Sequence, residues 1–300
     1  MKKYLGIDIG GTAIKYALLN EAGEIIEKGE TPTPKDTLES LMNSLDSFIS
    51  QYKDVISGIG MSAPGRIDNK RGYFYTGGAL SHYLSEVPLG DILSEKYSLP
   101  VAIDNDAKCA ANAELWLGAL KDVNSGVVVI LGTGIGGGIV LDKKVWRGIN
   151  GAAGEISNLP YDYNGLYENK LWAKINGVYG LVAPYAAKKE LPLEEANGRI
   201  FFEALHNGDE DAKEVFDQFI KTLVAGIVCM QVVLDVDKFC IGGGISAQDI
   251  LIDTLRDEVK KFFDSAEHFP CILPEIDCCQ FKNDANIIGA INNFFEAHGH

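Results

Sequence analysis

The stretch Gly126-Val-Val-Val-Ile-Leu-Gly-Thr-Gly-Ile-Gly-Gly-Gly138 determines how the rest of the chain is interpreted. Its first half, from Val127 to Leu131, is a continuous apolar run of mostly β-branched residues, which is typical of a strand covered on both faces. The glycines that follow can adopt positive φ and leave main-chain N–H groups open to a ligand. We therefore expect a phosphate to bind at this turn, on Gly132, Thr133, Gly134 and Gly136.

The same turn also matches the dinucleotide-binding fingerprint, as Gly132-x-Gly134-x-x-Gly137. That fingerprint requires a helix directly after the glycines. Residues 139–146 follow instead, with no helical period and with a polar turn at Asp142-Lys143-Lys144. This pattern predicts a hairpin and argues against a Rossmann site.

The N-terminus repeats the plan of the central stretch. Residues 4–29 contain an apolar strand, a glycine turn and two further strands, and the first turn reads Asp8-Ile-Gly10-Gly11-Thr12 with Lys15 close behind. Such a carboxylate can hold the water shell of Mg²⁺ while the N–H groups of the turn bind phosphate oxygens. The alternative is an aspartate that only caps an ordinary hairpin. Two copies of one plan indicate two related half-molecules, and we expect both glycine turns to face a shared cleft.

Composition narrows the class of protein. A chain of 300 residues with 46% hydrophobic content can bury a sizeable core, and its length favours two domains. A formal net charge of −15 argues against nucleic acid or an anionic membrane as the main partner. No apolar run reaches the roughly 18 residues of a membrane span, and no signal-peptide core follows the N-terminus, so we expect a cytoplasmic protein. The six cysteines show no metal-binding spacing, which favours reduced thiols.

A second group of polar residues stands where the short strand predicted over 99–104 meets a helix of small residues. Asp104, Asn105 and Asp106 occupy this junction. One interpretation is N-capping, which either of the first two could provide. The other is a catalytic base, since an acid aligned to a sugar hydroxyl would take its proton during phosphoryl transfer.

Three further segments are candidates for ligand contact. The loop Gly77–His82, which includes Gly78, follows a strand predicted over 55–62 and is either a substrate wall or a plain surface loop. Glu155 follows a run of small residues, which indicates a carboxylate facing a ligand. A third glycine turn, Gly242-Gly-Gly-Ile-Ser246, ends another predicted strand.

Together these motifs resemble those of the ROK family (repressor, open reading frame, kinase) of bacterial sugar kinases. The resemblance spans nearly the whole chain, in order, and rests on Asp8-Ile-Gly-Gly-Thr-Ala-Ile-Lys15, Asp104-Asn-Asp-Ala107, Gly132-Thr-Gly-Ile-Gly-Gly137, Gly154-Glu-Ile156 and Gly242-Gly-Gly-Ile-Ser246.

The resemblance implies an α/β, actin-like fold of two ribonuclease-H-like domains around a cleft. The first would span 1–116 with the last helix, about 285–300, and the second 117–284. It implies ATP and Mg²⁺ as ligands, with Gly243 and Gly244 near the adenosine, and we expect a homodimer. The reaction implied is transfer of a phosphoryl group from ATP to the 6-hydroxyl of a hexose or β-glucoside. Asp106 would be the general base, and Asn105 and Glu155 would hold sugar hydroxyls.

Two departures from the family pattern limit what can be transferred. Members typically continue Gly-Glu-Ile-Gly-His, whereas this chain places Asn158 at the histidine that holds both zinc and sugar. The downstream cysteine cluster is absent from 164–180, so we expect no structural zinc. Aromatic residues occupy this region instead, either as core that replaces the metal or as a surface that stacks on a second sugar ring or aglycone. They are Tyr161, Tyr163, Tyr167, Trp172 and Tyr179.

Three functional classes are compatible with a chain that resembles this family. A sugar kinase is favoured, because the base, both phosphate turns and the sugar carboxylate are all present, and the zinc-free members include kinases of β-glucosides and of N-acetylmannosamine. A DNA-binding repressor would need a basic helix-turn-helix ahead of the first strand, where we expect none. A sugar-binding regulatory member without catalysis is the remaining alternative, because Asn158 departs from the family.

Overall fold

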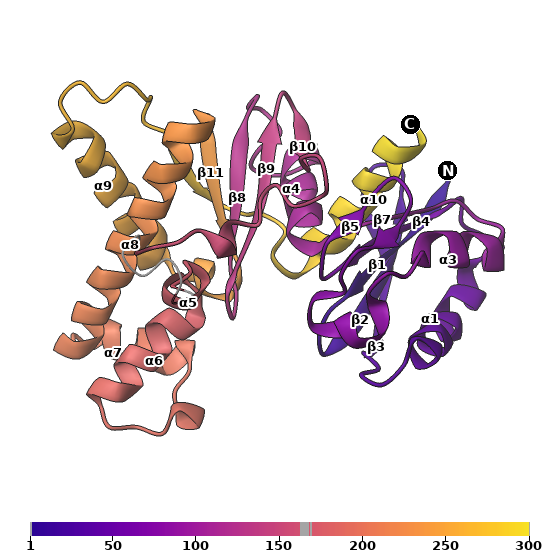
Figure 1. Cartoon of the computed structure of the whole chain (residues 1–300), viewed down its shortest axis with the longest axis horizontal. Helices are drawn as coiled ribbons and strands as arrows, with labels where there is room; N and C mark the ends of the chain where they lie inside the picture. Colours follow the sequence, from indigo (N-terminus) through magenta and orange to yellow (C-terminus); the bar gives the residue numbers. More distant parts are fainter. Residues whose placement is uncertain (1, 163–167, 169, 300) are drawn as a thin grey trace. The chain divides into compact units, whose positions relative to one another are not determined.

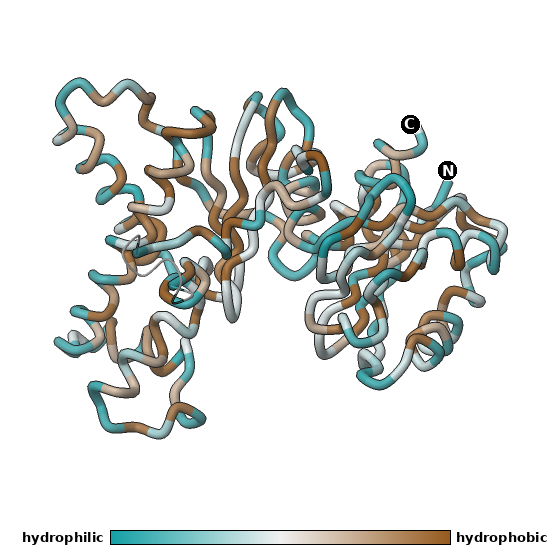
Figure 2. Tube along the Cα trace, in the orientation of Figure 1, coloured by the Kyte–Doolittle hydropathy of each residue, from teal (hydrophilic) through white to brown (hydrophobic). Residues whose placement is uncertain are grey.

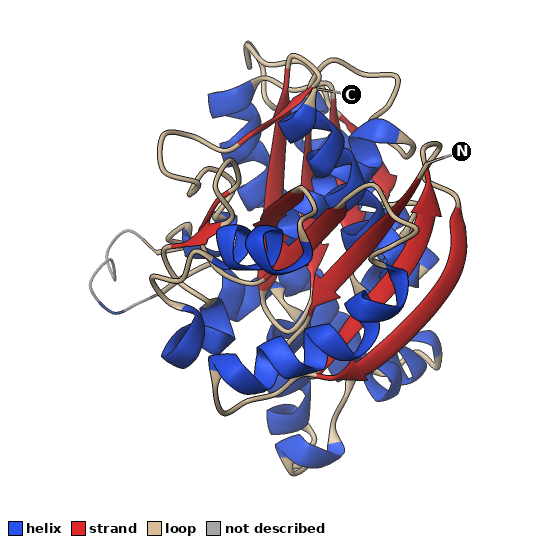
Figure 3. Cartoon of the chain, turned by 90° about the vertical axis from the view of Figure 1, so that its right-hand side faces the viewer, coloured by secondary structure: helices blue, strands red, loops and turns tan. Residues whose placement is uncertain are grey.

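The computed structural model describes residues 2–162, 168 and 170–299. The chain divides into two compact units. Unit 1 comprises Met1–Lys121, Lys144–Ala153 and Asn283–His300, and unit 2 comprises Asp122–Lys143 and Gly154–Lys282. Each unit combines a sheet of parallel and antiparallel strands with helices, so the described part of the chain has the predicted α/β class (Figures 1 and 3).

The sheet of unit 1 has five strands in the order β3-β2-β1-β4-β7. These strands are β1 (Lys3–Ile9), β2 (Ala13–Asn20), β3 (Ile25–Pro32), β4 (Ile59–Ala63) and β7 (Val101–Asn105). The first three form an antiparallel meander, whereas β4 and β7 run parallel to β1. The turn from β2 to β3 is closed by Asn20, whose Oδ1 accepts the N–H groups of Ala22 and Glu24.

The three parallel strands of unit 1 bring the candidate residues to one edge of the sheet. The register pairs Asp8 of β1 with Ser62 of β4, and Ser62 with Asp104 of β7. Parallel strands with this register end at the same edge, where open α/β sheets bind their ligands. Asp8 and the Asn105-Asp106 pair therefore lie at the same edge.

Helices cover this sheet, namely α1 (Leu38–Tyr52), α2 (Ser81–Leu84), α3 (Leu89–Tyr97), α4 (Asp106–Trp116) and α10 (Ala285–His298). α1 begins after Thr37, whose side chain accepts the N–H of Ser40, and it buries one apolar face made of Leu41, Leu45, Phe48 and Ile49. The last helix, α10, packs on α4, β1 and β4, as we expected from its apolar sequence. Gly289 permits this contact, because a Cβ there would lie 1.7 Å from the carbonyl oxygen of Cys109.

The second sheet has the order β10-β9-β8-β11-β12, which repeats the arrangement of the first. Its strands are β8 (Gly126–Leu131), β9 (Ile135–Leu141), β10 (Lys144–Trp146), β11 (Lys238–Gly242) and β12 (Glu275–Cys278). β8 is antiparallel to β9 and parallel to β11, which is parallel to β12. The hairpin predicted over 139–146 is present, and its turn residues Asp142 and Lys143 both have positive φ. The matching strand orders confirm the predicted duplication.

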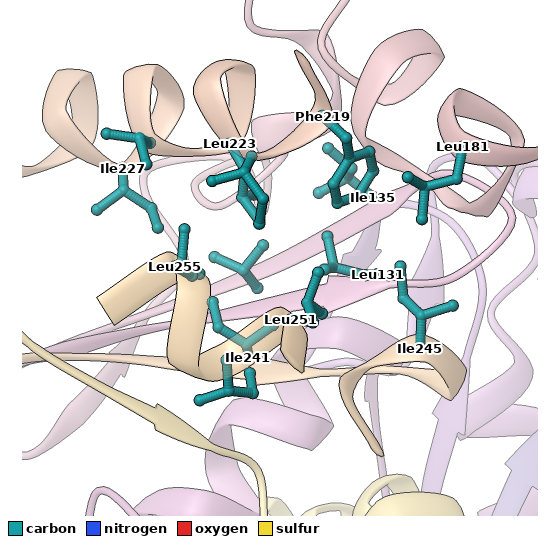
Figure 4. Close-up of a cluster of buried hydrophobic side chains, with 14 of the residues drawn as sticks. Leu131, Ile135, Leu181, Phe219, Leu223, Ile227, Ile241, Ile245, Leu251 and Leu255 are labelled. Carbon is teal, nitrogen blue, oxygen red and sulfur yellow. The ribbon is translucent and has the colours of Figure 1, made fainter. Parts of the chain in front are cut away.

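Unit 2 carries the helices α5 (Ala173–Asn176), α6 (Val178–Lys188), α7 (Gly198–His206), α8 (Glu210–Leu234) and α9 (Asp249–Ser265). α8 starts after Asp209, whose side chain accepts the N–H of Ala212. Figure 4 shows Phe219, Leu223 and Ile227 of α8 directed toward side chains of the strands and of α9. Burial of this continuous cluster holds the helices on the sheet.

α8 is the one helix of the described residues that is long and apolar enough, by length and composition, to cross a membrane. Its first turns are charged, however, with Glu210, Asp211, Lys213 and Glu214. Its apolar side belongs to the core of unit 2. Figure 2 shows hydrophobic residues along the central strands as well, so α8 is a core helix among other apolar elements.

Two sequence predictions need correction in detail. The strand predicted over 55–62 begins only at Ile59, because Val55 lies in a turn after α1 and is exposed. The segment Gly77–His82, predicted as a loop, contains a short 3₁₀ turn and the start of α2, and a small hairpin, β5 (Ile67–Asp68) with β6 (Tyr73–Phe74), precedes it. Phe74 and Leu84 are buried in the core of unit 1, so part of this loop is structural.

Candidate functional site

Asp8 is a buried carboxylate at the end of β1. Ser62 Oγ and Asn286 Nδ2 each donate a hydrogen bond to its Oδ1, both over 3.0 Å. Burial raises the pKa of Asp8, while these two hydrogen bonds and the charge of Lys15 oppose the rise. Both bonds converge on Oδ1. A cation or its water at Oδ2 would offset the cost of the buried charge.

The first glycine turn lies directly after Asp8, and two hydrogen bonds hold its backbone. The Gly10 N–H donates to the Ala13 carbonyl oxygen, and the Thr33 hydroxyl donates to the Gly10 carbonyl oxygen at 2.6 Å. Gly11 and Thr12 are exposed at the tip, and no heavy atom lies within 4 Å of where a Cβ on Gly11 would stand. The turn therefore offers bare backbone, as a phosphate site requires.

The junction of β7 and α4 separates two roles that the sequence left open. Asn105 caps α4, because its Oδ1 accepts the N–H groups of Ala107 and Lys108, and its Nδ2 donates to the Gly65 carbonyl oxygen. Asp106 is the first residue of the helix, and its Oδ1 accepts the Ala107 N–H at 2.8 Å. Asn105 is therefore the N-cap of α4, and Asp106 is not needed for capping.

Gly78 lies on the same unit, at the start of a short 3₁₀ turn. Its φ is +56°, and a Cβ there would lie 3.1 Å from the Cβ of Pro64. Gly65, which follows Pro64, accepts the side-chain hydrogen bond of Asn105. The loop that carries Gly78 therefore packs beside the segment that supports Asn105, and its glycine has a conformational reason as well as a possible ligand role.

The second glycine turn joins β8 to β9 in unit 2. The Gly132 N–H donates to the Gly134 carbonyl oxygen, and the Val178 N–H at the start of α6 donates to the Gly132 carbonyl oxygen at 2.8 Å. Gly177 lies so close that a Cβ on it would stand 2.4 Å from the Thr133 carbonyl oxygen. The turn is therefore held by α6.

The prediction that the glycines of this turn adopt positive φ is wrong. None of Gly132, Gly134, Gly136, Gly137 and Gly138 adopts positive φ. A Cβ on Gly134 would meet only Ala173 at an ordinary 3.7 Å, whereas one on Gly137 would collide with the Gly154 carbonyl oxygen at 2.5 Å. Packing explains Gly137, and access for a ligand is the explanation that remains for Gly134.

The third glycine turn follows β11 and borders a cavity of about 470 Å³. Gly243 has φ +94°, and its Cβ would stand 2.2 Å from the Leu131 carbonyl oxygen, so this glycine packs against the end of β8. A Cβ added to Gly244 would have no neighbouring heavy atom within 4 Å, and Gly244 lines the cavity. The other residues that line the cavity are Gly198, Arg199, Phe202, Glu203 and His206 of α7, and Ile245 and Gln248 after β11. No motif in the sequence marked the α7 residues as candidates.

Glu155 directly precedes the 3₁₀ turn η2 (Ile156–Asn158) of unit 2, and Asn158 ends that turn. Both side chains are exposed. Asn158 donates its amide hydrogens to the Glu155 carbonyl oxygen and to the Ser157 hydroxyl, at 3.4 and 3.1 Å. Gly154, with φ +85°, packs on Gly137 of β9 and thereby fixes where this turn starts. The turn thus presents one carboxylate and one amide to solvent.

The aromatic stretch divides between core and surface. Trp172 is buried and donates its Nε1–H to the Thr222 carbonyl oxygen, which fits the prediction of core in place of a metal. Tyr161 and Tyr179 are exposed and line a cavity of about 600 Å³ beside α6 and α8. Tyr163 and Tyr167 lie outside the described residues, as does most of the segment 163–169.

The bare glycines allow a test of ligand approach that is separate from folding. We expect Gly11→Val and Gly134→Val to fold normally, because neither position has positive φ or a close neighbour. Each should raise the KM for ATP, since the new side chain would occupy the space of a phosphate.

Gly243→Ala and Gly244→Ala form the matched pair for that experiment. The former should lower the melting temperature because of its collision with Leu131, and the latter should not. Steady-state kinetics and thermal melts of the four variants check the prediction. A folded Gly134→Val protein with an unchanged KM for ATP would show that this turn does not contact phosphate.

Comparison with known proteins assigns the chain to a family. The model of the ROK family matches residues 4–295. The glucokinase of Halalkalibacterium halodurans is 32% identical over 95% of this chain and 93% of its own length, and the β-glucoside kinase of Listeria monocytogenes is 30% identical over 98% of both. The crystal structure of a ROK family glucokinase from Streptomyces griseus with glucose and AMPPNP has a TM-score of 0.79 at 25% identity, covering 96% of this chain and 97% of that one.

The match extends over both units and includes all of the motifs on which the resemblance was based. Asp8, the three glycine turns, Asn105-Asp106 and Glu155 all fall inside the matched residues. The protein belongs to the ROK family of sugar kinases.

Proposed function

We propose that this ROK-family sugar kinase transfers the γ-phosphoryl group of ATP to the 6-hydroxyl of a hexose or β-glucoside, with Asp106 as the general base. The observation that carries the proposal is the register of the parallel strands in unit 1. It pairs Asp8 with Ser62 and Ser62 with Asp104, so Asp8 and Asp106 lie at one edge of the sheet. One carboxylate is buried and suited to a cation, and the other begins a helix capped by its neighbour. Two carboxylates in such different surroundings can take two different roles.

The nucleotide is proposed to bind on the glycine turns. The turns at Gly10 and Gly132 would receive phosphate oxygens on main-chain N–H groups, and Lys15 supplies positive charge on β2 opposite Asp8. We place the adenosine at Gly244, beside the cavity of about 470 Å³. When bound, Mg²⁺ supplies neutralisation of the phosphate charge, and Asp8 would hold it through water.

The sugar is proposed to bind between Asn105 and Asp106 on one side and Glu155 and Asn158 on the other, with Gly78 in the wall. This requires the two units to face one another across a cleft, in an actin-like arrangement. Asp106 accepts the proton of the attacking hydroxyl as that oxygen bonds to phosphorus, which keeps the charge on the oxygen from rising. Phosphoryl transfer otherwise depends on positioning, which the neighbouring groups provide.

The cellular setting follows the same proposal. An acidic sugar kinase whose substrates are ATP and a free sugar would act in the cytoplasm, as a homodimer and without bound zinc. The relatives reported above are a β-glucoside kinase and two glucokinases. Glucose and β-glucosides are therefore the first substrates to test, and N-acetylmannosamine is the alternative acceptor.

We expect Glu155→Ala and Asn105→Ser to raise the KM for sugar by about tenfold or more, with smaller effects on kcat. Both remove contacts that exist before the chemical step, so the loss appears in ground-state binding. Serine is preferred to alanine at position 105, because Asn105 also caps α4 and serine caps comparably. Initial rates against sugar concentration check the prediction.

Asn197→Ser is the matched control, since Asn197 caps α7 through the N–H of Ile200. It should leave the KM for sugar unchanged. If Asn105→Ser and Asn197→Ser behave alike, Asn105 is a cap and no more.

A further inference from the structure

The segment 144–153 begins with β10, the last strand of the second hairpin, and ends two residues before Glu155. Its packing was not apparent from sequence. It belongs to unit 1, whereas the bounds predicted from sequence, 117–284, put it in the second domain. The Ala153 N–H donates to the Arg147 carbonyl oxygen, which closes the segment into a loop. Gly151, with φ +76°, fits against the Ile67 carbonyl oxygen, where a Cβ would stand at 2.8 Å. The backbone that carries Arg147 is therefore fixed.

Arg147 uses its whole guanidinium on groups of unit 1. Nε donates to Asp104 Oδ2 at 2.7 Å, and Nη1 donates to the Val145 carbonyl oxygen at 3.1 Å. Nη2 donates to Asn293 Oδ1 at 3.0 Å and to Glu296 Oε2 at 3.4 Å, both on α10. The side chain of Asp104 is only 1% exposed, and that of Arg147 is 17% exposed, so solvent screens their ion pair little.

Asp104 passes this constraint to the candidate base. Its second oxygen, Oδ1, accepts the N–H of Asn105 at 2.8 Å. Asn105 in turn holds the first N–H groups of α4, where Asp106 is the first residue. The hydrogen-bonded path therefore runs from the Arg147 guanidinium, through one carboxylate and one capping amide, to the Ala107 N–H. Asp106 Oδ1 accepts that same N–H, so the path ends on the side chain of the candidate base.

We propose that Arg147 is a positioning residue for phosphoryl transfer, which orients Asp106 by clamping Asp104 and the end of β7. The inference rests on the proposed function, in which Asp106 is the base. Arg147 itself lies one residue removed from the chemistry, because it contacts Asp104 and α10 rather than Asp106. Since a misplacement of about 1 Å can cost about 10²-fold in rate, loosening this clamp should slow the chemical step.

The principal variant is Arg147→Lys, which keeps the charge but has one nitrogen in place of three. A single ammonium can pair with Asp104, but it cannot also reach Asn293 and the Val145 carbonyl oxygen in the same geometry. We expect kcat to fall about 10- to 100-fold. The KM for ATP should stay within about twofold, because the glycine turns are untouched.

Arg256→Lys is the matched control for the substitution. Arg256 also donates to one carbonyl oxygen and two carboxylates, those of Ile276, Asp253 and Asp277, but it is half-exposed on α9 of unit 2. It should leave kcat unchanged. Asn293→Ala provides a second probe, since it removes one acceptor of Arg147 and keeps the ion pair with Asp104. A smaller fall in kcat, about two- to tenfold, is expected there.

A double-mutant cycle with Asp106→Asn decides between positioning and a general structural role. If Arg147 acts through Asp106, Arg147→Lys should have no further effect on kcat once the base is removed, and the double variant should match Asp106→Asn within about twofold. Effects that multiply would overturn the inference. If Arg147→Lys fails to fold, the same cycle is run with Asn293→Ala, with the same two readings. A fully active Asp106→Asn enzyme would instead refute the proposed base, so the two failures can be told apart.

Discussion

Asp106→Asn is expected to lower kcat by about 10² to 10⁴ while the KM for sugar changes little. Asparagine keeps the shape and the acceptor oxygen of the side chain, so the hydrogen bond to the sugar hydroxyl can still form in the ground state. It cannot take the proton as the hydroxyl attacks phosphorus. The structure makes this substitution a clean test, because Asn105 caps α4 and the bond from the Ala107 N–H can be accepted by the amide oxygen.

The control for Asp106→Asn is Asp209→Asn, at the start of α8 in unit 2. Asp209 also holds a helix N-terminus, through the N–H of Ala212. The control should keep full kcat, and Asp106→Asn should keep the melting temperature of the wild type. A stable Asp106→Asn enzyme with full kcat would mean that Asp106 is only part of the helix start.

Asp8→Asn is expected to abolish most activity and yet to raise the melting temperature of the ligand-free protein by a few degrees. Burial raises the pKa of Asp8, so its ionised form destabilises the fold when no cation is bound. Asparagine keeps both hydrogen bonds, because Ser62 and Asn286 donate to the same oxygen. Loss of the cation site removes several kcal/mol of transition-state stabilisation, so kcat/KM should fall at least about 10²-fold.

The pH dependence of that stability has a definite sign. A carboxyl whose pKa is raised in the folded state binds its proton more tightly there, so its contribution to stability is lost as pH rises from its ordinary value of 3.8 through the raised value. The gain in melting temperature of Asp8→Asn should therefore be smallest near pH 4 and reach a plateau above the raised pKa.

Asp237→Asn is the contrasting variant for Asp8→Asn. Hydrogen bonds from Ser125 and the Asn124 N–H lower the pKa of Asp237, so its charge stabilises the fold and is lost only as pH falls through the lowered value. It should melt lower than wild type at neutral pH. Melts of the three proteins between pH 4 and 8 check the prediction, and a lower melting point for Asp8→Asn at neutral pH would contradict it.

The repeated plan of the fold could be predicted because local sequence patterns determine it. The runs 4–9 and 127–131 are mostly apolar, and each is followed by glycines and a hairpin. These features alone led to two half-molecules, and the two sheets have matching strand orders. The start of β4 was misjudged because Val55 has strand propensity, whereas the turn that follows α1 leaves it in solvent.

Candidate site residues could be proposed from sequence where a residue's type and its position at a strand end coincide, as for Asp8 and Asp106. The site was not predictable where partners come from distant parts of the chain. Asn286 and Asp8 are 278 residues apart in the sequence, and Arg147 and Asp104 are 43 apart. No local sequence pattern indicates either pair. The segment of Arg147 reads as one small-residue loop leading to Glu155, and only tertiary packing ties it to unit 1.

The most direct test of the central claim is to identify the product formed from Mg·ATP and each sugar of a panel by ³¹P NMR, with ADP measured in the same samples. The panel comprises glucose, fructose, mannose, N-acetylmannosamine, cellobiose and gentiobiose. We predict that at least one sugar yields a single phosphomonoester at its 6-position, in a one-to-one ratio with ADP. Release of inorganic phosphate only, or binding of a panel sugar with no turnover of ATP, would contradict the account and favour a sugar-binding protein without catalysis.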